Sequence, residues 1–386
     1  MNLFKIFTLG ESVKTSLFLL FLCIMIFDYA GYGYYLFYLP FFYLIRYQGL
    51  KLIDRNFFIV LLWGAFYGVT LWYHSGVLQY NTVLTPIINM PALYLMGKYL
   101  ARYNNRSSLI IIIFLLTLSL SGVALLSVFK DIALNGYLVV GLERNIPLIG
   151  ITTGEGYMAA TGISSRLIPL AFFYVLLLCP YDKLRKYIIF TFAILAIVCL
   201  LRIQSRTSVV GCCFVLIAVI ILTWKSINIK QKFFLLLGFC FIILTIGYVL
   251  TNYSDQLGII DRFQSEDVET GGGRLELKQN VISHMMDYPF GGMRVAYAHD
   301  IWFDCARAAG IIPFLLLVYI TLNYLKNLFI FFRKKNEALT IKITIGIVSF
   351  AMFIVFSAEP VLEGIPMCFA LFCLLYGILI YMLKSE

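Results

Sequence analysis

The stretch SSLIIIIFLLTLSLSGVALLSV, residues 107–128, runs for 22 positions without a single charge. A helix needs about 17–25 apolar residues to cross a hydrocarbon core roughly 30 Å thick. Similar runs recur along the chain of 386 residues, of which 61% are hydrophobic and only 13% charged. So few charges cannot cover a soluble globule of this size, and period-2 alternation typical of an outer-membrane barrel is missing. We therefore predict an all-α polytopic integral membrane protein, since a helix satisfies its own backbone in lipid.

Apolar runs between charged, glycine or proline breaks predict about twelve transmembrane helices. They fall at 15–30, 33–45, 56–73, 82–98, 107–128, 167–179, 187–203, 207–224, 233–251, 301–325, 340–357 and 366–383. The first run lacks an A-x-A cleavage pattern, so we expect a retained helix and not a removed signal peptide. For residues 15–45, one long tilted helix is the alternative to two short ones.

Basic residues are distributed unevenly between the two sides that this count defines. Twenty of the 30 lysines and arginines fall in loops on one side, and positive charge is typically retained in the cytoplasm. Both termini are thus expected to be cytoplasmic, with two larger periplasmic loops at 129–165 and 252–300. The net charge of +10 then reflects loops beside anionic lipid and not nucleic-acid binding. Without a visible repeat or boundary, residues 1–386 are predicted to form a single membrane domain.

Several kinds of site are disfavoured by the sequence. The nine cysteines show no C-x-x-C spacing, so neither a disulfide framework nor structural zinc is predicted. Motifs for nucleotide binding, zinc hydrolysis or a serine nucleophile are also missing, and we expect no cofactor and no metal. His74 and His284 look incidental.

The outer loop 252–300 concentrates the chemistry of this apolar chain. It holds 12 of the 50 charged residues and two of the three histidines. Three glycines, 271–273, precede Arg274 at the predicted start of an amphipathic helix that lies on the membrane and ends before Pro289. Free N–H groups, flexible glycines and a guanidinium together suit a phosphate. A solvated arginine in a flexible loop is the alternative.

A second cluster begins where the tenth predicted helix starts. Asp300, Asp304 and Arg307 share one helix face, just after His299. Because ionisable groups inside a membrane are expensive, we expect an Asp304–Arg307 pair to face the bundle interior or a wet cavity. The alternative is a structural ion pair beside an interfacial histidine. His299 itself is a candidate to take a proton from an acceptor hydroxyl.

Further charged residues are predicted at the same outer face. Arg202 and Arg206 flank the junction of the seventh and eighth helices, and Arg166 opens the sixth. Singly each is more typical of a structural role, whereas together they suggest a site for a polyanion. Glu359 and Glu363, in the last outer loop, are an alternative base.

Four motifs in this order resemble the O-antigen polymerase and ligase superfamily. They are SRTS at 205–208, GGRLE at 272–276, PFGG at 289–292 and AHDIWFDCARAAGIIP at 298–313. The resemblance is specific over roughly residues 202–313. Within this range, the loop and helix start at 252–313 carry the sequence signature of the superfamily. It departs from the family at Asp300, where asparagine is usual.

This resemblance implies a metal-independent glycosyltransferase of the bacterial inner membrane whose active site faces the periplasm. Its donor and acceptor would be undecaprenyl-pyrophosphate-linked oligosaccharides, with a chain-length regulator and a flippase as further partners. Arg206 and Arg274 would grip the pyrophosphate, His299 would activate the acceptor, and Arg166 is carried over loosely. The remaining candidates, assigned to substrate binding, are Arg202, Asp300, Asp304 and Arg307.

Three activities are compatible with these features. We favour an O-antigen polymerase in lipopolysaccharide biosynthesis, because loop 252–300 is compact at 49 residues and ligases tend to carry a longer loop. An O-antigen ligase, which transfers the polymer to lipid A-core, is the first alternative. A polysaccharide exporter or flippase is the alternative from another class, but it should show mid-membrane polar groups and related halves.

Overall fold

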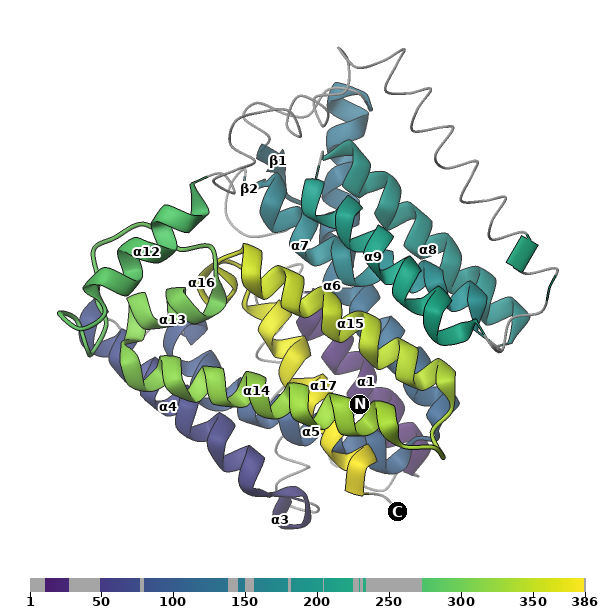
Figure 1. Ribbon diagram of the computed structural model, residues 1–386, viewed down its shortest axis with the longest axis horizontal. Helices are drawn as coiled ribbons and strands as arrows, with labels where there is room; N and C mark the ends of the chain where they lie inside the picture. The colour runs from purple at the N-terminus through teal and green to yellow at the C-terminus, as the bar shows by residue number, and fades with distance from the viewer. Residues whose placement is uncertain are drawn as a thin grey trace, which may run out of the picture.

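The computed structural model describes residues 11–27, 49–76, 80–137, 145–149, 156–179, 182–203, 205–224, 229, 232–233 and 273–384. Within these ranges nearly all of the chain is helical (Figure 1). Seven helical segments are long and apolar enough to cross a membrane. The prediction of an all-α polytopic membrane protein is confirmed at this level, while the predicted helices at 33–45 and 233–251 lie almost entirely outside the described residues.

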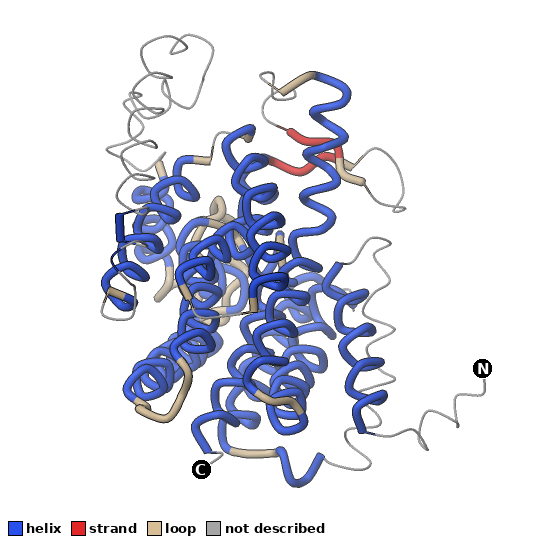
Figure 2. The backbone as a smooth tube through the Cα atoms, turned by 90° about the vertical axis from the view of Figure 1, so that its right-hand side faces the viewer, coloured by secondary structure: helices blue, strands red, loops and turns tan. Residues whose placement is uncertain are grey.

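The spanning segments follow the predicted hydropathy closely. They are α4 (Arg55–Ser75), α6 (Arg106–Asn135), α7 with the 3-10 segment η4 (Ala160–Leu178), α8 (Lys183–Arg202), α14 (Ile311–Arg333), α15 (Leu339–Ala358) and α17 (Pro366–Lys384). Three further apolar segments are α1 (Glu11–Phe27), α9 (Arg206–Thr223) and α5 (Met90–Tyr103), the last preceded by the π-helical segment η2 (Tyr80–Asn89). Figure 2 shows the long helices running side by side.

The centre of the bundle is the pair α5 and α17. A Cβ added at Gly97 would lie 2.0 Å from the carbonyl oxygen of Leu374, and one added at Gly377 would lie 1.9 Å from that of Tyr94. Only glycine allows this approach, as is typical of membrane helices that pack through small residues. Nearly every other residue of α17 is buried as well, so the last helix is the core around which the others pack.

Short elements collect at the two ends. At one end, α3 (Gly49–Leu52) and the C-terminal turn of α17 meet at Asp54, whose carboxylate accepts hydrogen bonds from Lys98 (2.8 Å) and Lys384 (3.2 Å). At the other end lie α12 (Arg274–His284), α13 (Ile301–Ala309) and α16 (Val361–Gly364), together with the antiparallel strands β1 (Asn145–Pro147) and β2 (Tyr157–Ala159) (Figures 1 and 2).

Two predicted boundaries are wrong. The span predicted at 301–325 is broken at Gly310, whose φ of 88° ends α13 and starts α14; the spanning helix therefore begins ten residues later. The loop predicted at 129–165 is shorter, because α6 continues to Asn135 and α7 begins at Ala160. Polar residues at these helix ends, including Asp131, are satisfied by the bundle and so extend the helices beyond the apolar runs.

Candidate active site

The candidate site lies where α12, α13 and α16 meet, at the end of the bundle away from the C-terminus (Figure 1). Arg274 is the first residue of α12, His299 immediately precedes the N-cap of α13, and Glu359 follows α15. Three segments that are far apart in the sequence thus bring a guanidinium, an imidazole and a carboxylate together.

Glu359 is the common neighbour of the other two groups. Its Oε1 lies 3.4 Å from Nη2 of Arg274, and its Oε2 lies 4.0 Å from Nδ1 of His299. The Glu359 side chain is 7% exposed, whereas those of Arg274 and His299 are 30% and 36% exposed. The carboxylate therefore forms the floor of the site, and the arginine and histidine remain open to a ligand.

The start of α12 has the geometry that the glycine run predicts. Gly273 adopts a left-handed conformation (φ 75°) at the N-cap, which residues with a side chain rarely adopt. A glycine has no side chain with which to cap the helix, and Arg274 places a cation beside the first N–H groups. The predicted helix before Pro289 is confirmed, and its apolar residues Leu275 and Ile282 are exposed, as is Met286 in the turn that follows.

His299 sits in a strained turn held by a buried carboxylate. It has a φ of 53°, the only positive value for a residue other than glycine in the described ranges. Asp304 accepts hydrogen bonds from the N–H groups on both sides, that of Ala298 at 2.7 Å and that of Asp300 at 3.1 Å. Burial raises the pKa of Asp304 to about 6. Asp304 therefore fixes the backbone on both sides of His299, and with it the direction of the imidazole.

Asp300 also supports the turn. Its Oδ1 caps α13 by accepting hydrogen bonds from the N–H groups of Trp302 (3.1 Å) and Phe303 (3.4 Å), and its Oδ2 pairs with Lys278 at 2.8 Å. Both oxygens are therefore occupied by the protein. Asp300 and Asp304 are both buried and bonded within the protein near His299, and their assignment to substrate binding stays a prediction.

Arg307 is likewise committed to the protein. It pairs with Glu363 and, at 3.5 Å, with Asp304, and its guanidinium lies 4.3 Å from the centre of the Tyr297 ring. The predicted Asp304–Arg307 pair is confirmed. Substrate binding by Arg307 is not supported, because its side chain is only 13% exposed and contacts protein groups on several sides.

The PFGG motif packs the loop against the break at Gly310. The N–H of Gly292 donates to the carbonyl of Ala308 (3.2 Å), and the N–H of Ile311 donates to that of Pro289 (2.9 Å). A Cβ at Gly291 would lie 2.5 Å from the Ala308 oxygen. The motif's glycines therefore permit two backbones to touch just behind the His299 turn.

His74 contributes to the same packing, contrary to the expectation that it is incidental. Its Nε2 lies 2.7 Å from the carbonyl oxygen of Phe290, and a Cβ at Gly292 would collide with its ring. His284 is half-buried, and its hydrogen-bond partners Asn280 and Ser283 belong to its own helix. Only His299 among the three histidines reaches the candidate site.

The imidazole of His299 is suited to accept a proton. Burial, and secondly the positive charge of Arg274, lower the pKa of His299 below its usual 6.5. At neutral pH the ring is therefore uncharged. In the described part of the chain its buried Nδ1 has no hydrogen-bond partner, which leaves that atom facing Glu359.

Comparison with known proteins supports the sequence resemblance. A family model described as O-antigen ligase matches residues 191–304, from α8 to the first half of α13. This match supports membership of the O-antigen polymerase and ligase superfamily. Members of this superfamily are membrane glycosyltransferase-like enzymes. No curated protein matches the chain.

Of the superfamily residues in the matched segment, Arg274 and His299 meet at the site. Arg206 begins α9, and its side chain lies outside the described residues. Arg166, on α7, is half-buried, and its Nε is buried with no hydrogen-bond partner among the described residues. Arg166 and Glu359 both act on the Cys368 thiol electrostatically, so Arg166 lies on the side of the bundle nearest to Glu359.

Arg202 does not belong to this site. Its Nη2 pairs with Asp131 at 2.7 Å and donates to the carbonyl of Gly136 at 3.1 Å, and neither ionic side chain has any exposed surface. The Arg202 guanidinium is fully buried and paired with protein groups, and its assignment to substrate binding stays a prediction. Arg202 ties α8 to the end of α6.

We expect Arg202→Ala to lower the amount of protein in the membrane, because it leaves the Asp131 carboxylate buried and unpaired. Breaking a buried pair in this way costs about 3–5 kcal/mol, while replacing both partners with apolar residues is often neutral. The double variant Arg202→Met with Asp131→Leu should therefore recover a normal level. Immunoblots of membranes and melting temperatures in detergent measure both. Normal stability in the single variant would contradict a structural role.

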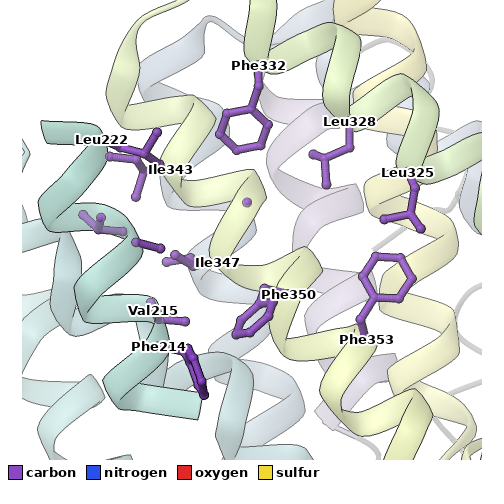
Figure 3. A pocket seen from close by; sticks show the side chains of 13 residues that line it. Phe214, Val215, Leu222, Leu325, Leu328, Phe332, Ile343, Ile347, Phe350 and Phe353 are labelled. Atoms are coloured by element: carbon purple, nitrogen blue, oxygen red, sulfur yellow. The ribbon is translucent and has the colours of Figure 1, made fainter. Parts of the chain in front are cut away.

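The membrane-embedded part of this superfamily member also contains an apolar pocket of about 420 Å³ between α9, α14 and α15 (Figure 3). Hydrophobic side chains line it, among them Phe214, Phe332, Phe350 and Phe353. None of the candidate charged residues contributes to it. The pocket suits hydrocarbon, because its lining is apolar.

Sequence reasoning found the arginine and the histidine but underestimated three supporting residues. The sequence offers Glu359 only as an alternative base and does not show which residues it contacts. Lys278 is not among the predicted site residues, and His74 is predicted to be incidental. The position of Lys278, four residues after Arg274 and hence on the same helix face, was a usable signal. His74 offered none, because its contact with Phe290 spans 216 positions.

Proposed function

We propose that this chain is an O-antigen polymerase, which joins undecaprenyl-pyrophosphate-linked repeat units at the periplasmic face of the inner membrane. The observation that carries the proposal is the meeting of Arg274 and His299 over the buried Glu359, at one open end of the bundle. A sugar already activated by pyrophosphate needs only charge stabilisation on the leaving group and an oriented hydroxyl.

The proposed reaction uses the two groups in turn. The acceptor hydroxyl oxygen attacks the anomeric carbon of the donor sugar, the bond from that carbon to the pyrophosphate oxygen breaks, and the hydroxyl proton passes to the neutral His299. The Arg274 guanidinium, joined by Arg206 from the start of α9, stabilises the departing undecaprenyl pyrophosphate. Arginine forks match phosphate oxygens bidentately, so in this mechanism the charge stabilisation comes from arginines.

The distribution of basic residues supports the proposed orientation. The end of the bundle opposite to the candidate site holds the hydrogen bonds of Lys98, Lys384, Lys334 and Arg106. Because lysine and arginine are enriched in cytoplasmic loops, this end is assigned to the cytoplasm and the site to the periplasm. The exposed apolar residues of α12 would then rest on the outer surface of the bilayer.

A ligase is the second candidate, because the matching family model carries the ligase description. Both activities would use the same donor and the same two residues, and they would differ in the acceptor. The compact loop 252–300 favours the polymerase, whose acceptor is another lipid-linked repeat unit.

A deletion strain tests the proposal on a lipopolysaccharide gel. A polymerase mutant should retain a single repeat unit on the core, and the ladder should return when the intact gene is supplied. Bare core with accumulated lipid-linked polymer would instead assign the ligase activity. Lipid-linked units retained in the cytoplasm would assign a flippase and overturn the proposal.

A further inference from the structure

Glu359 makes ion-pair contacts with both Arg274 and His299. It lies at the end of α15, outside the segment 191–304 that matches the family. We propose that Glu359 is a positioning residue for His299, and that Arg274 shares its carboxylate until the pyrophosphate of the donor draws the guanidinium away. This inference rests on the proposed function and adds an order of events to it.

The geometry places one carboxylate oxygen toward each partner. Oε1 lies 3.4 Å from Arg274 and Oε2 lies 4.0 Å from Nδ1 of His299, which is beyond hydrogen-bond distance. Such contacts are often long in an empty site and tighten around a ligand. Nδ1 is buried and, within the described residues, makes no hydrogen bond, so a small movement of the carboxylate would satisfy it.

Charged and titratable groups surround this pair on every side. They are Arg166 of α7, Arg274 and Lys278 of α12, Asp300, Asp304 and Arg307 at α13, Glu363 of α16 and Cys368 of α17. Asp300 pairs with Lys278, while Asp304 and Glu363 both pair with Arg307. Arg274 is a cation that competes with His299 for the Glu359 carboxylate.

Binding of a pyrophosphate would change this balance. Two phosphate oxygens offer the Arg274 guanidinium shorter, charge-assisted hydrogen bonds than the 3.4 Å contact with Glu359. The freed carboxylate then accepts a hydrogen bond from Nδ1–H of His299, which fixes the tautomer with Nε2 as the proton acceptor. The acceptor hydroxyl is therefore activated only after the donor has bound.

The test follows His299 itself by NMR in the full-length protein. The chain has three histidines, so imidazole-labelled protein in nanodiscs gives three ring signals, and His299→Ala identifies the one of interest. The pH is varied with and without inorganic pyrophosphate. In the wild type, pyrophosphate should raise the pKa of His299 by about one pH unit or more, since an opposite charge nearby typically moves a pKa by roughly 1–3.

In Glu359→Gln, the pKa of His299 should start lower than in the wild type, and the rise caused by pyrophosphate should shrink to less than half. The matched control is Glu276→Gln, an exposed carboxylate in the first turn of α12, which should behave as the wild type does. Unchanged His74 and His284 signals show that a variant is folded. If Glu359→Gln does not fold, Glu359→Asp replaces it, because the shorter side chain retracts the charge from Nδ1.

Two results would overturn the inference. An unchanged His299 pKa in the Glu359 variant would show that the carboxylate does not act on the ring. A wild-type pKa that stays constant at saturating pyrophosphate would show that Arg274 does not control it. The gel of the deletion strain is independent of both, so a ligase pattern there would leave Glu359 in its role while refuting the polymerase.

Discussion

His299→Ala is expected to abolish long-chain polysaccharide while leaving the protein in the membrane at its normal level. Removing a general base typically slows a reaction by about 10²–10⁴-fold, which is enough to erase a ladder on a gel. The fold should tolerate the change because the imidazole is 36% exposed and the turn is held through backbone N–H groups bonded to Asp304. The ladder and a membrane immunoblot measure the two effects.

The matched control is His284→Ala. That histidine is also on the periplasmic side in the proposed orientation, but it is half-buried and bonds to its own helix, so the ladder should be unchanged. A normal ladder in His299→Ala would remove His299 from the mechanism.

The pH dependence of the wild-type reaction gives a second check on His299. Because the pKa of His299 lies below the usual value of 6.5 before the donor binds, kcat/KM for the donor, which reports the free enzyme, should be constant above about 6.5 and fall only below it. A fall that begins above that value would contradict a neutral histidine base.

Much of the fold could be predicted, because the hydropathy of a segment indicates whether it lies in lipid or in water. The predicted spans 107–128 and 340–357 lie within α6 and α15. In lipid these segments form helices because a helix satisfies its own backbone hydrogen bonds. The break at Gly310 was not visible in this way. Hydropathy continues through it, and the positive φ arises because the PFGG segment packs there, a tertiary contact that no local pattern encodes.

The candidate site was predictable only as far as local context reaches. Arg274 after a glycine run and His299 at a helix start are local features, and both are at the site. Their partner Glu359 is 85 positions away from Arg274. Likewise Asp131, which pairs with Arg202, is 71 positions away from it. Helix spacing placed Asp304 on a common face with Asp300, but it could not show that the carboxylate turns back to the N–H groups beside His299.

Arg274→Ala should also abolish the ladder at a normal protein level. Loss of one donor to a charge that develops in the transition state typically lowers a rate by about 10²–10³-fold, and Arg274 is 30% exposed, so its removal leaves no cavity in the core. Arg294→Ala, an exposed arginine in the same segment, is the matched control and should keep the ladder. A normal ladder in Arg274→Ala would overturn the assignment of the pyrophosphate site.

Arg274→Lys separates charge from geometry. A lysine keeps the positive charge, but it cannot present two parallel N–H groups to a pair of phosphate oxygens. It also gains less by leaving Glu359, because its ammonium is a compact point charge without the planar fork that matches two phosphate oxygens. We therefore expect Arg274→Lys to fail as Arg274→Ala does, with His299 unresponsive to pyrophosphate. Full activity would mean that charge alone suffices, and the bidentate grip would be discarded while the site itself stands.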